Sequence, residues 1–148
     1  MRQLVKAGHQ VQIATAAPAY VFTRDIVTQT ENQVSVRYVV LDSGAKQSDA
    51  LTVDRIGSLE TFARVSVLRR AELIAQEVGW LHTIRADLVV SDIVPIAFAA
   101  AKEAGLKSVG VSNFSWDFIY SEYLLSAGAT HRAIVWQIAE DYAKVGYG

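Results

Sequence analysis

Polar side chains that could bind a small hydrophilic ligand follow the segments of this sequence that read as β-strands. These side chains are Thr15, Asp42, Asp92, Asn113, Ser115 and Asp117, with the indole ring of Trp116 among the last of them. Ligands of open α/β sheets bind beyond the carboxyl ends of the strands. Carboxylate, amide and hydroxyl groups hydrogen-bond sugar hydroxyls, and an aromatic face stacks on a sugar ring. The sequence therefore predicts a site for a sugar-like ligand.

Two of these positions also have a simpler structural interpretation. Asp92 would accept hydrogen bonds from a ligand, or act as a base if burial raised its pKa, but an Asp after a strand more often caps the next helix. The aromatic residues at 114, 116, 118 and 120 alternate. They would either grip a ligand or pack a lid or an interlobe face, and both alternatives stay open.

The sequence does not predict a metal site, an ATP site or a Ser/His/Asp catalytic site. His9, His82 and His131 fall on separate elements without a second ligand at helical spacing, and the chain has no cysteine, so no metal site is predicted. A Gly-rich phosphate loop and a Ser/His/Asp set are also lacking, so we expect no ATP site and assign no catalytic residue. The Arg69-Arg70 pair reads as a solvated patch.

Strands and helices that would position the ligand site alternate along the chain. The expected strands cover residues 11–17, 33–41, 87–92 and 108–112, and the expected helices cover 19–26, 49–84, 95–104 and 129–143. Asp49 is the expected N-cap of the long helix, and Trp80 and Trp136 are expected in the core. Segment 87–92 is apolar between polar ends, which is typical of a strand buried on both faces of a parallel sheet. The fold class is therefore α/β with a mostly parallel sheet.

Composition restricts the class of protein and its partners. The 148 residues suit one domain, and 51% hydrophobic with 20% charged residues is typical of a globular protein. The net charge of −1, without long runs of either sign, argues against nucleic acid or a membrane as a partner. No apolar stretch is long enough for a signal peptide or a membrane span, so we expect a cytoplasmic protein.

Four strings of residues resemble the N-terminal, glycosyltransferase-like region of the plant-type L-arabinokinase family. They cover residues 50–55, 86–95, 112–120 and 131–142, and the last two are long and unusual. This resemblance implies an incomplete Rossmann-like lobe over residues 1–143, the first lobe of a GT-B-like fold. Residues 144–148 resemble a Lys-x-Gly-Tyr-Gly string that the family places in the second lobe.

The resemblance also implies what the chain does. Members of the family carry a further GHMP-type kinase domain that phosphorylates L-arabinose with ATP and Mg²⁺, so this chain itself is expected to hold no cofactor. We expect an L-arabinokinase-like fragment that is inactive alone, whose partners are a sugar or nucleotide sugar, the remaining lobe and the kinase domain. The alternatives are a non-catalytic regulatory or scaffolding module of a sugar kinase, and a gene-model product without an independent role.

The family pattern places one more strand, with a Gly-His-rich loop, before the segment that begins at Leu4. That strand would be the central one of a doubly wound sheet. Without it, two strand edges would lack partners, and unpaired edges are templates for association. We therefore expect self-association through strand edges.

Overall fold

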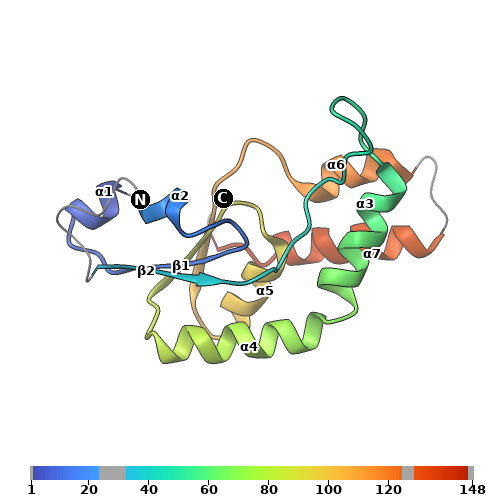
Figure 1. Cartoon of the computed structure of the whole chain (residues 1–148). Helices are drawn as coiled ribbons and strands as arrows, with labels where there is room; N and C mark the ends of the chain where they lie inside the picture. The colour runs from blue at the N-terminus through green and yellow to red at the C-terminus, as the bar shows by residue number, and fades with distance from the viewer. Residues whose placement is uncertain (1, 24–32, 125–128, 147–148) are drawn as a thin grey trace. The chain divides into compact units, whose positions relative to one another are not determined.

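The computed structural model describes residues 2–23, 33–124 and 129–146. The chain divides into two compact units, Met1–Val40 and Leu41–Gly148 (Figure 1).

The first unit is built around a pair of parallel strands. Its elements are α1 (Arg2–Lys6), β1 (Val11–Thr15), α2 (Tyr20–Thr23) and β2 (Val34–Tyr38). Gly8 ends α1 with a φ of +89°, a conformation that a residue without a Cβ adopts at little cost. The strands pair in register from Val11 opposite Val34 to Thr15 opposite Tyr38. The helix predicted for 19–26 is found at Tyr20–Thr23, and positions 24–26 lie outside the described residues.

The second unit contains a strand–helix–strand motif with helices packed against it. Its elements are α3 (Arg55–Phe62), the π-helix η1 (Ala63–Val67), α4 (Arg70–Thr83), β3 (Leu88–Ser91), α5 (Pro95–Glu103), β4 (Lys107–Gly110), α6 (Trp116–Tyr123) and α7 (Ala129–Tyr142). β3 and β4 are parallel, with Leu88 opposite Lys107. α5 connects them, begins with Pro at its first turn, and contacts both strands as well as α4 and α7. The predicted unit of two parallel strands joined by a helix is confirmed.

The described strands form two separate parallel pairs, β1 with β2 and β3 with β4. The predicted α/β class with parallel strands is confirmed, and the architecture is compatible with a Rossmann-like lobe.

The long helical region starts later than predicted and is interrupted. Asp49 does not cap a helix, because its Oδ1 accepts hydrogen bonds from the N–H groups of Leu51 and Thr52 in a tight turn, both at 2.9 Å. Asp54 caps α3 instead, accepting from the N–H of Gly57 at 2.8 Å. An isolated antiparallel bridge between residues 47 and 53 accounts for the difference, since it holds this stretch in a turn.

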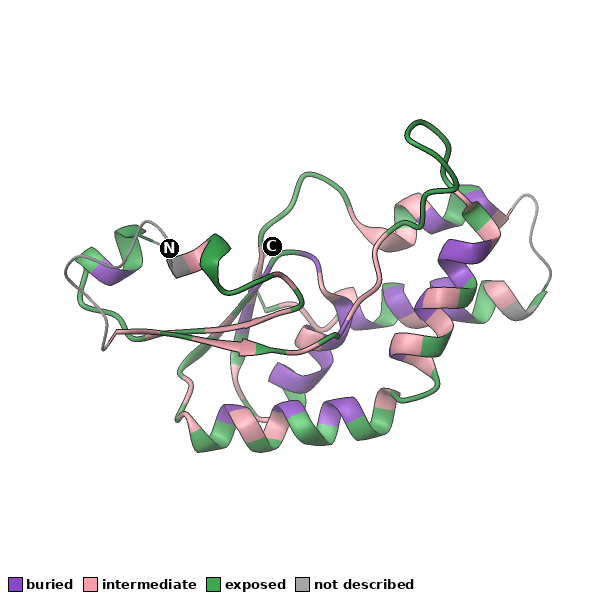
Figure 2. Cartoon of the chain, viewed as in Figure 1, coloured by how far each residue is buried: buried purple, intermediate pink, exposed green. Residues whose placement is uncertain are grey.

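A core cluster joins α3, α6 and α7, as the burial colouring shows (Figure 2). Its fully or largely buried members are Leu59, Phe62, Tyr120, Tyr123, Ile134, Val135 and Ile138. On α7 the buried side chains come from positions 134, 135, 138 and 141, whereas Trp136 is 72% exposed. The prediction that Trp136 belongs to the core was therefore wrong, whereas Trp80 is half-buried.

Candidate functional site

Three loop segments of the second unit are joined by hydrogen bonds into one site. The name loop cluster is used below for this site. It consists of segments 41–44, 91–94 and 112–117 together with the side chains of Tyr120 and Tyr142. The hydroxyl of Tyr120 donates to the carbonyl oxygen of Gly44 at 2.9 Å. The hydroxyl of Tyr142 donates to the carbonyl oxygen of Ile93 at 2.8 Å and accepts from the N–H of Trp116 at 3.3 Å. Tyr120 thus links one loop to α6, and Tyr142 links another loop to α7.

Asp42 brings a half-buried carboxyl group to the loop cluster. Its Oδ1 accepts from the N–H of Gly44 at 2.8 Å. Burial raises the pKa of Asp42 above its usual range, while hydrogen bonds from the backbone of Gly44 and Ser43 and from the side chain of Trp116 act in the opposite direction. The structure therefore brings together Asp42 and Trp116, two of the predicted site residues, across more than 70 positions of sequence.

The π-helix η1 helps to hold the Asp42 segment. Leu68 N–H donates to the carbonyl oxygen of Ala63 at 2.9 Å, five residues earlier. Within this turn the buried hydroxyl of Ser66 donates to the carbonyl oxygen of Leu41 at 2.8 Å, next to Asp42. π-Helical turns are rare and frequently occur at functional sites.

The two tyrosines of the loop cluster remain protonated. Burial, and next to it the charge of Asp42, raises the pKa of Tyr120 well above its usual range. Burial also raises the pKa of Tyr142, where the charges of Asp42 and Asp117 act in the same direction. Both hydroxyls are therefore hydrogen-bond donors at any physiological pH. Sequence reasoning missed them, because their partners lie 76 and 49 positions away.

The ring of Trp116 lies within an aromatic group. It stacks on Tyr120, with centroids 5.2 Å apart and an interplanar angle of 29°, and Phe114 meets it edge-on at 5.4 Å. Phe114 and Phe118 are 41% and 62% exposed. The aromatic string therefore both packs inward, through Trp116 and Tyr120, and presents apolar rings to the outside.

Asp117 carries an unsatisfied acceptor at the first turn of α6. Its Oδ1 is buried and has no hydrogen-bond partner among the described residues. Buried carboxylate oxygens are normally paired with a donor, so this atom can accept from a ligand hydroxyl or a water. Ser115 occupies the N-cap position of α6 without a side-chain capping bond, and Asn113 is exposed.

Asp92 lies at the surface, and the helix-cap interpretation of it is wrong. The hydroxyl of Ser91 accepts from the N–H of Val94 at 3.0 Å, and α5 has no side-chain capping bond. The next residue, Ile93, is buried and has a φ of +47°. A β-branched residue in this left-handed region is strained, and such strain is typical of functional loops.

Thr15, the remaining predicted site residue, belongs to the first unit. Its Oγ1 accepts from the N–H of Ala17 at 3.0 Å, and its carbonyl oxygen accepts from the N–H of Val39 at 2.9 Å. Its observed role is to shape the turn after β1.

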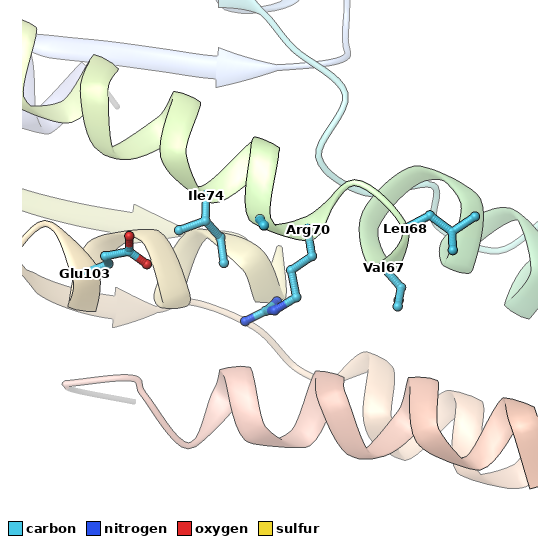
Figure 3. Close-up of a pocket in the computed structure, with 6 residues that line it drawn as sticks. Val67, Leu68, Arg70, Ile74 and Glu103 are labelled. Carbon is cyan, nitrogen blue, oxygen red and sulfur yellow. The ribbon is translucent and has the colours of Figure 1, made fainter.

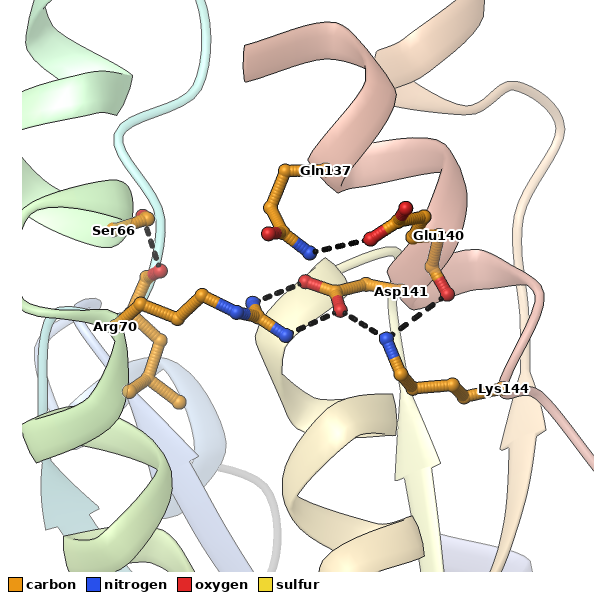
Figure 4. Close-up of polar contacts among 7 residues, drawn as sticks. Ser66, Arg70, Gln137, Glu140, Asp141 and Lys144 are labelled. Atoms are coloured by element: carbon orange, nitrogen blue, oxygen red, sulfur yellow. Dashed lines mark hydrogen bonds and ion pairs between the residues drawn. The ribbon is translucent and has the colours of Figure 1, made fainter. Parts of the chain in front are cut away.

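A groove of about 450 Å³ lies elsewhere, at the start of α4 (Figure 3). It is lined by Val67, Leu68, Arg70, Ala71, Ile74 and Glu103. Arg70 points from the groove toward α7, where it binds Asp141 through two bonds of 2.5 and 2.6 Å (Figure 4). Lys144 also contacts Asp141, at 2.9 Å. The prediction of a solvated patch was thus wrong for Arg70, because α7 supplies a buried carboxylate.

The described part of the chain lacks two other kinds of feature. No group of three or more His, Asp or Glu side chains could hold a metal ion. No described helix is long and apolar enough to cross a membrane.

Comparison with known proteins places the chain by similarity. Neither a family model nor a solved structure matches it. The chain is 55% identical to L-arabinokinase of Arabidopsis thaliana over 143 residues, which is 97% of this chain and 14% of that protein. The resemblance to L-arabinokinase predicted from the four residue strings is thereby confirmed. Along almost its whole length, the chain is homologous to one segment of L-arabinokinase that amounts to about a seventh of that protein.

Proposed function

We propose that the chain is the sugar-facing lobe of a GT-B-like module in a cytoplasmic L-arabinokinase-type protein, a sugar kinase. The observation that carries this proposal is the 55% identity along 97% of the chain. The loop cluster supports it, because a half-buried carboxyl at Asp42, an unpaired carboxylate oxygen at Asp117 and the Trp116 indole are suited to a sugar ring. Phosphate transfer from ATP, with Mg²⁺, would belong to a kinase domain outside these residues.

Ligand binding by the 148-residue chain tests the proposal. Calorimetric titration with L-arabinose and with UDP-sugars should give saturable binding of one of them. Asp42→Asn and Trp116→Phe should weaken that binding by about tenfold each, since a good hydrogen bond or stacking contact contributes roughly 1–1.5 kcal/mol. Trp136→Phe is the matched control, because Trp136 is exposed on α7 and outside the loop cluster.

A second candidate is a non-catalytic module that regulates or scaffolds a sugar kinase. It is favoured by one observation: the hydroxyls of Tyr120 and Tyr142 already bind backbone carbonyls inside the loop cluster, which is a structural use of polar groups. If the calorimetric titrations with L-arabinose and with UDP-sugars both give no heat of binding, the result favours this second candidate. Conversion of L-arabinose and ATP to a phosphorylated sugar by this chain alone would contradict both candidates.

A further inference from the structure

The outward face of α7 is apolar around a large exposed ring. Trp136 lies at its centre and is 72% exposed. Arg132 and Glu140 lie about one turn before and one turn after it, and both are exposed (Figure 2). The other exposed side chains described between residues 129 and 143 are alanines, at 129, 133, 139 and 143. The outer face of a surface helix normally carries charged and polar residues, so this face has the composition of one that packs against a partner.

The three large side chains of this face form a single ridge. Arg132, Trp136 and Glu140 are spaced four residues apart, so they follow one another along the helix surface. In the commonest packing of two helices, four-residue ridges of one helix lie in the grooves beside the same ridges of the other. The alanines on both sides of the ridge leave room in those grooves. The face can therefore accept a helix that presents an equally bulky ridge.

The charges of the ridge match those of a second copy of the same ridge. Arg132 and Glu140 have opposite charges and lie four positions on either side of Trp136. In an antiparallel pair centred on Trp136, residue 132 of one copy therefore lies beside residue 140 of the other. A two-fold axis repeats every contact, so two ion pairs form and the two indole rings meet at the axis. A parallel pair would place like charges together.

Both charged groups are available for such contacts. The carboxylate of Glu140 accepts one hydrogen bond, from Nε2 of Gln137 at 3.3 Å. Within the residues that the structure describes, the ion pairs of α7 are those of Asp141, on the buried side of the helix. Arg132 and Glu140 are thus not used by the packing of the chain itself.

From this self-complementary ridge we propose that α7 is a dimer interface, on which a second copy of this chain docks its own α7 in antiparallel orientation. The contact uses helix side chains and does not involve the strand edges or the loop cluster. One pair of 14-residue helices forms a contact at the small end of specific interfaces, which bury roughly 1,200 Å² or more in total. The dimer is therefore weak, with a dissociation constant in the micromolar range.

Sedimentation velocity of the full chain over a series of concentrations tests the proposal. The natural chain should show a monomer–dimer equilibrium. Arg132→Glu and Glu140→Arg should each weaken the dimer by at least about tenfold, because like charges then lie side by side. Neither change should unfold α7, since an anion near the start of a helix and a cation near its end are both favourable. Circular dichroism verifies this.

Mixing the two variants gives the sharpest result. An equimolar mixture of Arg132→Glu and Glu140→Arg should dimerise again, because both pairs across the interface then carry opposite charges. Trp136→Ala should weaken the natural dimer by at least about tenfold, as a Trp at the centre of an interface commonly dominates binding. Glu60→Arg is the matched control, with the same change of charge at an exposed position of α3.

Three outcomes would overturn the proposal. The first is a natural chain that stays monomeric at every concentration. The second is a dimer that Arg132→Glu leaves unchanged, since the copies would then meet through another surface, such as a strand edge. The third is a mixture of the two charge variants that remains monomeric.

Discussion

The hydroxyl of Tyr142, on the last helix, donates to the carbonyl oxygen of Ile93, a residue held at a φ of +47° in the loop after β3. The same hydroxyl accepts from the N–H of Trp116, the first residue of α6, which follows β4. One phenol oxygen therefore links the ends of both strands of the second unit. Removing it should loosen the two loops together.

Tyr142→Phe should lower the free energy of unfolding by about 1–2 kcal/mol, because it removes two hydrogen bonds and leaves a buried carbonyl without its donor. Urea denaturation followed by circular dichroism measures this change. Tyr38→Phe is the control, since Tyr38 is 72% exposed and should tolerate the same change. Equal stabilities of the two variants would refute the linking role of Tyr142.

Asp42→Asn should stabilise the chain at neutral pH and remove a pH-dependent loss of stability. Burial raises the folded-state pKa of Asp42, so the folded state binds a proton more readily than the unfolded state, whose pKa is about 3.9. The unfolding free energy must then fall as pH rises from below that value through the raised pKa. Denaturant midpoints from pH 3 to pH 7 should show the natural chain losing stability relative to the variant.

Asp49→Asn should change the stability at neutral pH in the opposite direction from Asp42→Asn. Backbone hydrogen bonds, first that of Leu51, lower the pKa of Asp49. Its contribution is therefore present above the unfolded pKa and is lost as pH falls, so this variant should be the less stable one at neutral pH. The same direction for both Asn variants would contradict the assignment for Asp42.

Asp141→Ala should be strongly destabilising. The carboxylate is 2% exposed and holds both Arg70 and Lys144, and breaking a buried ion pair by removing one partner costs about 3 kcal/mol. Chemical denaturation should register this loss. In Glu72→Ala, which removes the exposed partner of Arg69, the midpoint should hardly move, because exposed pairs contribute little.

Arg85→Gly should stabilise the chain by about 0.5–1 kcal/mol. Arg85 follows α4 with a φ of +52°, and its neighbour Ala86 donates back to the carbonyl oxygen of Leu81. Gly105 holds the same place after α5, with a φ of +73°. Gly105→Ala should therefore destabilise by about 1 kcal/mol, and thermal melts of the two variants should shift in opposite directions.

Local features of the fold could be predicted from the sequence, and long-range ones could not. The apolar run at 88–91 and the glycine at 105 mark a strand and a helix end through neighbouring residues alone. Asp49 was assigned to a helix because a cap and a turn use the same Asx chemistry, and only the bridge between residues 47 and 53 distinguishes them.

In the candidate site, too, local features could be predicted from the sequence and long-range contacts could not. Asp42, Trp116 and Asp117 were predicted from their positions after strands, and the structure brings them to one cluster. Tyr120 and Tyr142 were not predicted. A Tyr on an apolar helical face has the sequence pattern of an ordinary core residue, and the carbonyl groups that accept from these two hydroxyls lie far away in the sequence. Arg70 was misjudged for the same reason, since Asp141 lies 71 positions away.

The π-turn at Ala63–Val67 also fixes how many residues can separate α3 from α4. Each residue of an α-helix advances the chain by ~100° around the helix axis. Deleting one residue there would restore ordinary helical winding and rotate everything that follows by about a quarter turn relative to α3. Ser66 and Arg70 would then face away from Leu41 and Asp141, so we expect this stretch to tolerate substitution far better than any change of length.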